Sequence, residues 1–134
     1  MKFVIPVIPI PKGRPRFTRR GFAFTPQKTR VAQETIKWYL KSTFKDKPLT
    51  GALQCVIRCV MPIPASLSKK KQGLLAGTWH MKRPDVDNIL KLVLDSANGI
   101  LWYDDAQISI LTATKEYGRD PRIEIELDSL FTGA

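Results

Sequence analysis

Hydrophobic residues recur along this chain with the two periods that distinguish strands from helices. Stretches rich in Val, Ile and other strand formers predict four strands, over residues 2–10, 52–62, 107–117 and 122–127. Helical spacing predicts three helices, over residues 26–44, from Ser66 or Ser68 to Leu75, and from about Asp85 to Gly99. This order of elements indicates an α+β fold with a mixed sheet packed against helices, as a single domain over residues 1–134.

The first strand and the first helix carry boundary signals of their own. Pro6 and Pro9 predict an edge or bulged strand, because proline donates no hydrogen bond to a ladder. Residues 11–25 then form a basic loop or loose hairpin. In the helix that follows, Thr25 is the predicted N-cap and Pro26 the first helical residue. The predicted apolar face of this helix consists of Val31, Thr35, Trp38 and Tyr39.

The helix that starts near Asp85 is strongly amphipathic on a helical wheel. Its apolar side consists of Ile89, Leu90, Leu92, Val93, Leu94 and Ala97. Its polar side consists of Asp87, Asn88, Lys91, Asp95 and Asn98. This polar stripe places two carboxylates, with an amine between them, along about two turns of one face.

The chain is strongly basic, with a formal net charge of +10, but its charges are unevenly distributed. Residues 1–84 carry eighteen Lys and Arg against two acids, whereas residues 85–134 carry ten acids against four Lys and Arg. Five of the twelve acids lie between Arg83 and Gln107, namely Asp85, Asp87, Asp95, Asp104 and Asp105. A basic region that grips phosphates and an acidic region that holds cations account for this polarity.

The acidic residues near the helix start have two interpretations. Carboxylate oxygens are the ligands that a hard divalent ion prefers, and such an ion can activate water and offset charge on a phosphodiester. Alternatively, Asp85 or Asp87 caps the helix and complements its dipole, and Asp87 forms a surface ion pair with Lys91. The pair Asp104–Asp105 is then an acidic turn. Composition and spacing alone leave both interpretations open.

Several motifs around these acids are specific. Residues 83–91 read Arg-Pro-Asp-Val-Asp-Asn-Ile-Leu-Lys, and residues 102–107 read Trp-Tyr-Asp-Asp-Ala-Gln. Residues 11–17, Pro-Lys-Gly-Arg-Pro-Arg-Phe, and residues 114–117, Thr-Lys-Glu-Tyr, extend the pattern. Together these motifs resemble the RusA-type Holliday junction resolvases, and the resemblance covers most of the chain.

The resemblance implies a homodimeric endodeoxyribonuclease that depends on Mg²⁺, or on Mn²⁺ in its place. It implies cutting of four-way DNA junctions by paired symmetric nicks, in recombination or repair. By motif position, the implied metal ligands are Asp85, Asp87 and Asp105, and Lys91 joins them as a catalytic residue. Asp104 remains an alternative to Asp105 as the third ligand, and Asp95 has a supporting role.

Basic side chains supply candidates for contact with DNA phosphates, since guanidinium and ammonium groups pair well with them. The candidates are Lys12, Arg14, Arg16, Arg19, Arg20, Lys69, Lys70, Lys71, Lys82 and Arg83. Phe17 and Phe22, interleaved with the arginines, suit stacking on splayed bases. A solvated loop with core-anchoring phenylalanines, and a solubilising helix face, are the simpler alternatives. His80 lies near the acidic motif but lacks the partners of a catalytic triad.

The cysteines and the hydropathy of the chain indicate where in the cell the protein is expected. Cys55 and Cys59 point to one face of a predicted strand without zinc-ligand companions, so buried free thiols are expected. The apolar opening segment is short, interrupted by prolines and followed by basic residues, which is atypical of a signal peptide. No apolar run approaches the roughly 18 residues that span a bilayer. We therefore expect an intracellular protein that associates with DNA and with no membrane.

The sequence thus supports one hypothesis and one rival. The hypothesis is a metal-dependent, structure-selective DNA endonuclease that acts on four-way junctions as a two-fold dimer. The rival is a non-catalytic, basic nucleic-acid-binding protein whose aspartates only cap a helix. Metal-dependent nicking of a junction distinguishes the two.

Overall fold

A computed structural model describes residues 1–13, 16–21, 23–24 and 26–130 of the chain. The elements in chain order are β1 (Lys2–Ile5), β2 (Arg16–Phe17), β3 (Ala23–Phe24), α1 (Gln27–Thr43), β4 (Leu53–Pro62), α2 (Lys69–Leu75), α3 (Val86–Ala97), the 3₁₀ turn η1 (Asp105–Gln107), β5 (Ile108–Gly118) and β6 (Arg122–Ser129). One sheet has the strand order β1-β6-β4-β5, and β2 and β3 form a separate hairpin. The predicted α+β class with a mixed sheet is confirmed.

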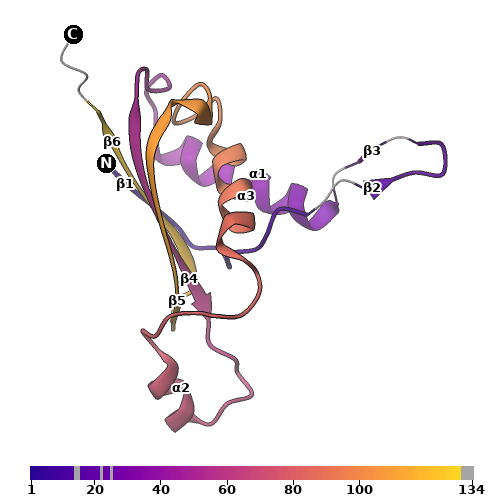
Figure 1. The fold of residues 1–134 in the computed structure, drawn as a ribbon, viewed down its shortest axis with the longest axis vertical. Coiled ribbons are helices and arrows are strands. Elements are labelled where there is room, and N and C mark those ends of the chain that lie inside the picture. The colour runs from indigo at the N-terminus through magenta and orange to yellow at the C-terminus, as the bar shows by residue number, and fades with distance from the viewer. Residues whose placement is uncertain (14–15, 22, 25, 131–134) are drawn as a thin grey trace.

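The two long helices lie on one side of the sheet, where α1 contacts both α3 and β1, and α3 also contacts β5 (Figure 1). The β2–β3 hairpin and α2 project away from this body in different directions (Figure 1). No helix in the described ranges is long and apolar enough to cross a membrane.

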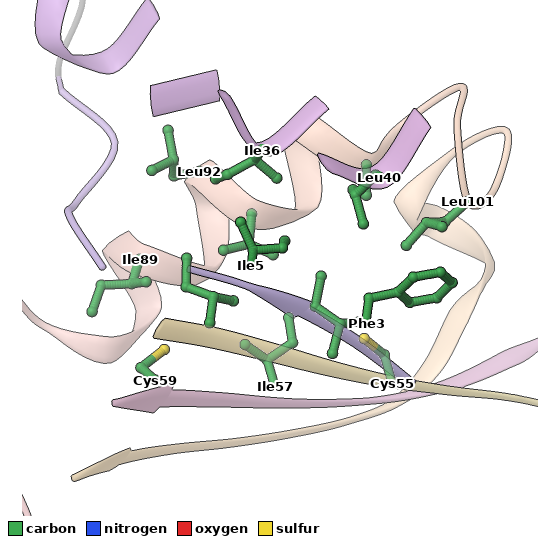
Figure 2. Packing of buried hydrophobic residues seen from close by; sticks show 14 of the residues in the cluster. Phe3, Ile5, Ile36, Leu40, Cys55, Ile57, Cys59, Ile89, Leu92 and Leu101 are labelled. Atoms are coloured by element: carbon green, nitrogen blue, oxygen red, sulfur yellow. The ribbon is translucent and has the colours of Figure 1, made fainter. Parts of the chain in front are cut away.

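The core fills the space between these two helices and the sheet (Figure 2). The helices contribute Ile36 and Leu40 from α1 and Ile89 and Leu92 from α3, all with at most 1% of their surface exposed. Every second residue of β4 points toward them, because side chains alternate across a strand. Figure 2 shows three of these, Cys55, Ile57 and Cys59, directly beneath the helices.

The strand order brings distant parts of the chain together. β4 pairs in parallel with β5 and antiparallel with β6, so β5 and β6 are consecutive in sequence but separated by β4. Leu53 and Ile108, the first residues of β4 and β5, are register partners. The start of β5, and the turn η1 before it, therefore lie at the end of the sheet that the last turn of α3 approaches (Figure 1).

α1 presents a different face to the core from the predicted one. Its buried residues are Thr29, Ile36 and Leu40, whereas Val31 and Trp38 are 51% and 64% exposed. The prediction was wrong for Val31 and Trp38, because the side of α1 that meets the core is the one with Ile36 and Leu40, whereas Tyr39 of the predicted face is partly buried against the core. Thr29 compensates for its burial by accepting a 2.9 Å hydrogen bond at Oγ1 from the backbone N–H of Gly13.

Several element boundaries also differ by a few residues. β1 ends at Ile5, just before Pro6, so the predicted strand over residues 2–10 was too long, although its edge position is confirmed. Pro26 is the N-cap of α1 instead of its first helical residue, and Thr25 lies outside the described residues. Of the two candidate caps of α2, Ser68 is the one observed, since its hydroxyl accepts from the backbone N–H of Lys71.

The two cysteines are buried and free, as predicted. Burial in the core raises the pKa of both thiols to about 11. Because the thiolate is the reactive form, both are inert near neutral pH.

The sheet face opposite the helices carries a network of charges. Arg58, between the core residues Ile57 and Cys59, points to this face and forms ion pairs with Glu116 and Glu124. Arg122 and Lys2 also contact the Glu124 carboxylate, at 2.6 and 3.1 Å. Burial acts to raise the pKa of Glu124, but these hydrogen bonds and charges outweigh it and lower the pKa.

Candidate active site

The start of α3 presents Asp85, Asp87 and Lys91 on its polar stripe. Asp85 occupies the N-cap position, yet its side chain makes no capping hydrogen bond, which is the usual structural role of aspartate there. Asp85, Asp87 and Lys91 are all exposed. The structure therefore leaves the Asp85 carboxylate free to bind a ligand.

A hollow of about 500 Å³ lies at this helix start. Its lining consists of Pro11, Arg83, Pro84, Asp85 and Asn88. One arginine and one aspartate thus face the same space, together with the first turn of a helix, whose free N–H groups favour anions. Such a lining suits a phosphate that is held near a carboxylate.

Asp104 and Asp105, adjacent in sequence, have different environments. Asp104 caps η1, because its carboxylate accepts from the backbone N–H of Ala106 at 3.0 Å, and Gln107 completes a capping box. That hydrogen bond lowers the pKa of Asp104. Burial raises the pKa of Asp105, and the neighbouring carboxyl groups of Asp104 and Asp95 raise it further. Asp104 thus caps the turn, whereas the surroundings of Asp105 disfavour its charged form.

The acids gather at the two ends of α3 instead of at one. Asp105 lies near enough to Asp95, in the last turn of α3, to feel its charge. Asp85 lies ten residues before Asp95, and a helix rises about 1.5 Å per residue, so about 15 Å separates the two ends. Within the described residues, no three Asp, Glu, His or Cys side chains lie together closely enough to hold one metal ion.

The donors nevertheless fit a hard divalent ion by their chemistry. They are carboxylate oxygens, and burial first, then the neighbouring Asp104 and Asp95, raise the pKa of Asp105. Mg²⁺ usually keeps several waters and takes only one or two carboxylates, besides substrate phosphates. Asp85 and Asp87 could supply two carboxylates at one end of α3, and Asp105 could supply one at the other end. The remaining ligands would be waters and substrate phosphates.

Lys12 connects the two ends of this helix. Its backbone N–H donates to the carbonyl of Asn88 at 3.0 Å, and its ammonium forms an ion pair with Asp95. The predicted DNA contact of Lys12 therefore competes with an ion pair inside the protein. Sequence inspection missed this pair, because the two residues are far apart along the chain.

Lys115, in β5, holds the segment that leads into Asp85. Its Nζ donates to the carbonyl oxygens of Lys82 and Pro84, at 2.6 Å each. His80 is anchored beside it, since its backbone N–H donates to the carbonyl of Lys115 at 3.0 Å. The His80 ring packs against the Tyr117 ring, with 4.6 Å between the ring centroids. Burial lowers the pKa of His80, and the charges of Lys115 and Lys82 lower it further. We infer that Lys115 sets the position of Asp85.

The Lys115→Met protein is expected to lose about 1–3 kcal/mol of stability, because two carbonyls lose a charged donor. It should also require more Mg²⁺ for half-maximal cutting, since the approach to Asp85 is no longer held in place. Thermal unfolding and a Mg²⁺ titration of junction cleavage measure the two effects. Lys115→Arg should restore part of both, and Lys47→Met, which changes an exposed lysine elsewhere, should change neither. A fall in melting temperature without any shift in the Mg²⁺ requirement would limit Lys115 to a structural role.

The candidate DNA-binding residues occupy three surfaces. Arg19 and Arg20 are exposed at the tip of the β2–β3 hairpin, beside Phe17, which is 71% exposed. The lysines of α2, Lys69, Lys70 and Lys71, are exposed beyond the end of the sheet. Lys82 and Arg83 are exposed directly before Asp85. Arg16 belongs to β2, while Arg14 and Phe22 lie outside the described residues.

The fold and this site together define a class, a small α+β protein with basic surfaces around carboxylates suited to phosphodiester chemistry. The chain belongs to the RusA endodeoxyribonuclease family, whose model, described as endodeoxyribonuclease RusA, matches residues 6–128. The chain is also 30% identical over 135 residues to a protein of Bacillus subtilis (strain 168) that is named "Uncharacterized protein YqaN". This similarity covers 93% of each of the two chains.

Membership of this family decides between the two functional hypotheses. The protein is an endodeoxyribonuclease of the Holliday junction resolvase type, and the rival of a non-catalytic binding protein is set aside. Nucleases of this family depend on a divalent metal ion and act on branched DNA.

Proposed function

We propose that this protein resolves four-way DNA junctions by paired symmetric nicks, using Mg²⁺ and acting as a homodimer inside the cell. The observation that carries the proposal is the Asp85 carboxylate, which stands at a helix start without a capping role and faces a hollow that Arg83 also lines. An aspartate that makes no capping hydrogen bond, beside a hollow that also offers an arginine to a phosphate, suits metal-dependent phosphodiester hydrolysis.

Asp85, Asp87 and Asp105 are the proposed ligands of the ion. When bound, a divalent ion offsets negative charge on the phosphate and lowers the pKa of water. Mn²⁺ suits the same oxygen donors and is expected to substitute for Mg²⁺. Each carboxylate acts by orienting its oxygens toward the cation, and the Lys115 contacts keep Asp85 in place while it does so.

Lys91 is the proposed positive group at the scissile phosphate. It lies one helical turn after Asp87 on the same stripe, and its exposed ammonium is within reach of a phosphate bound at the helix start. A fixed positive charge there stabilises the negative charge that develops on the phosphate during cleavage.

A second copy of the chain is the proposed source of the missing carboxylates. Asp85 precedes α3, whereas Asp105 lies close enough to feel the charge of Asp95, about 15 Å further along the helix axis, so we infer that one protomer does not direct both at one ion. A two-fold axis that runs two α3 helices antiparallel places the Asp85 end of one beside the Asp105 end of the other. The same axis suits a four-way junction, since each protomer then meets one of two equivalent strands.

Basic residues on the three surfaces described above are proposed to hold the junction arms. Phosphate contacts of this kind release counterions, so junction binding should weaken steeply with added salt. The exposed Phe17 on the hairpin is available to stack on an unpaired base near the branch point.

Metal removal tests the proposal directly. A labelled synthetic four-way junction, incubated with the protein and Mg²⁺, should yield nicks at symmetric positions in two opposing strands. EDTA in place of Mg²⁺ should abolish nicking while the protein–junction complex remains on a native gel. Duplex DNA of the same sequence is the control and should stay uncut. Tight junction binding without nicks in Mg²⁺ or Mn²⁺ would contradict the proposal.

A further inference from the structure

The outward side of α1 carries apolar residues that the core does not use. Val31 and Trp38 are both more than half exposed. They lie seven residues apart, about two helical turns, so they share one side of the helix, away from the buried Ile36. Large apolar side chains that gather on an exposed face of a soluble protein mark contact sites.

A hollow of about 400 Å³ lies on this side of α1. Its lining consists of Val31, Glu34, Thr35, Trp38 and Tyr39, and we call it the Trp38 hollow. The Trp38 and Tyr39 rings meet edge to face, with 5.0 Å between their centroids. Trp and Tyr are the residues that most often dominate the binding energy of protein interfaces. The Trp38 hollow therefore suits one large apolar side chain of a ligand.

Basic residues accompany the Trp38 hollow along the same segment. Residues 27–47 carry six Lys and Arg against two acids, all of them exposed. They are Lys28, Arg30, Lys37, Lys41, Lys45 and Lys47, against Glu34 and Asp46. Within the part of the chain that the structure describes, none of the six pairs with an acid. A partner with acidic residues complements this unpaired charge.

Lys41 connects the Trp38 hollow to a second one. It lies one helical turn beyond Trp38, and together with Phe44 and Lys45 it lines a hollow of about 250 Å³. An extended peptide advances about 3.3 Å per residue. When an apolar side chain of such a peptide occupies the Trp38 hollow, acids a few positions further along reach Lys41 and Lys45.

The composition of the Trp38 hollow distinguishes a peptide from two other occupants. DNA presents a continuous row of phosphates, and the Glu34 carboxylate in the lining repels them. A second copy of the chain would bring the basic α1 of one protomer against that of the other. A peptide with an apolar residue among acids fits both parts, because the apolar residue fills the hollow and the acids face the lysines. Its N–H groups can also donate to Glu34.

We propose that the Trp38 hollow, with Lys41 and Lys45 beside it, docks an acidic segment of a partner protein that presents one large apolar side chain to Trp38. This contact goes beyond junction cleavage, because no residue of the hollow belongs to the catalytic or DNA-binding residues described above. It recruits the nuclease through a protein instead of through DNA.

Fluorescence anisotropy with a labelled acidic peptide tests the proposal. The probe is fluorescein-Asp-Glu-Asp-Phe-Leu-Asp-Glu-Asp, and the full chain should bind it at low salt with a Kd below ~100 μM. The Trp38→Ala protein should bind at least ~10-fold more weakly, because truncated tryptophans cause some of the largest losses at interfaces. Lys41→Glu should weaken binding to a similar degree through repulsion of the acids. A peptide with Gly-Ser in place of Phe-Leu should lose binding as well.

Trp79→Ala and Lys69→Glu are the matched controls. Trp79 is 68% exposed, and Lys69 is an exposed lysine outside α1, so each control removes the same kind of side chain elsewhere. Both proteins should bind the peptide as the parent does. A Kd above ~100 μM for the parent would overturn the proposal, as would a Trp38→Ala protein that binds as tightly as Trp79→Ala.

Junction binding and sedimentation of the Trp38→Ala protein address the other two occupants. Neither property should change, and neither should the melting temperature. Weaker junction binding with unchanged peptide binding would assign the hollow to DNA, and a loss of self-association would assign it to a second copy; both results would overturn the proposal. The peptide assay uses neither DNA nor metal, so its failure and a failure of junction cleavage are separate results.

Discussion

The Asp85→Asn protein is expected to nick four-way junctions at least ~100-fold more slowly than the parent, while binding them at least as tightly. The neutral amide loses the charge that attracts a divalent ion, and ligands of this kind contribute several kcal/mol of transition-state stabilisation. Binding should persist because the substitution removes a negative charge from the hollow that Arg83 also lines, where a DNA phosphate is proposed to bind. Single-turnover cleavage and gel-shift titration on the same junction give both quantities.

Because Asp85 is the N-cap of α3, Asp85→Asn should remove the charge without disturbing the helix. Asparagine is as good an N-cap residue as aspartate, so α3 should begin at the same residue and the melting temperature should not fall. Asp128→Asn, an exposed acid of β6 with no role in the site, is the matched control and should cut normally. Equal losses of cutting and of junction binding would show that Asp85 acts through the fold and not through the reaction.

The Asp105→Asn protein is expected to lose cutting to a similar degree, at least ~100-fold, whereas Asp104→Asn should remain within about tenfold of the parent. The two residues are neighbours, but Asp104 accepts the Ala106 N–H and caps η1, and asparagine can accept that same hydrogen bond. Asp105 carries the raised pKa that burial and the facing acids produce. Its charge is therefore the one that a cation would stabilise.

Cleavage by the two variants at several Mg²⁺ concentrations separates these roles. Asp105→Asn should remain slow at every concentration, and Asp104→Asn should approach the parent rate as Mg²⁺ rises. The opposite ranking, with Asp104→Asn the slower protein, would assign the third ligand to Asp104. Circular dichroism and thermal unfolding of both variants check that the overall fold is intact.

Local patterns predicted the parts of the fold whose partners lie nearby in sequence. α3 extends over Val86–Ala97 as its amphipathic pattern indicated, and all its buried residues except Ser96 belong to the predicted apolar side. The Ser68 cap and the central position of β4 also follow from short segments. Helix caps, turns and strand alternation depend on a few neighbouring residues, so the chain itself contains the information needed to predict them.

Contacts between distant residues were not predictable in the same way. The buried face of α1 depends on which side meets α3 and β1, and helical spacing alone also allowed the row that contains the exposed Trp38. Lys115 reaches the carbonyls of Lys82 and Pro84 because β5 runs beneath the start of α3. A lysine in a strand gives no local sign of such a role.

The amino-acid sequence by itself determined the family, the acidic motif and the amphipathic helix that carries most of it. Those properties depend on residue type and on spacings shorter than a few turns. Only the tertiary structure decided where each acid lies, placing Asp105 close enough to Asp95, in the last turn of α3, to feel its charge, whereas Asp85 is the N-cap of that helix. It also made β5 an edge strand, with no other segment of the described residues hydrogen-bonded to the outer side of residues 108–114. Both results follow from the strand order. Because β4 pairs between β5 and β6, β5 becomes an edge strand, and its start lies at the end of the sheet near the last turn of α3.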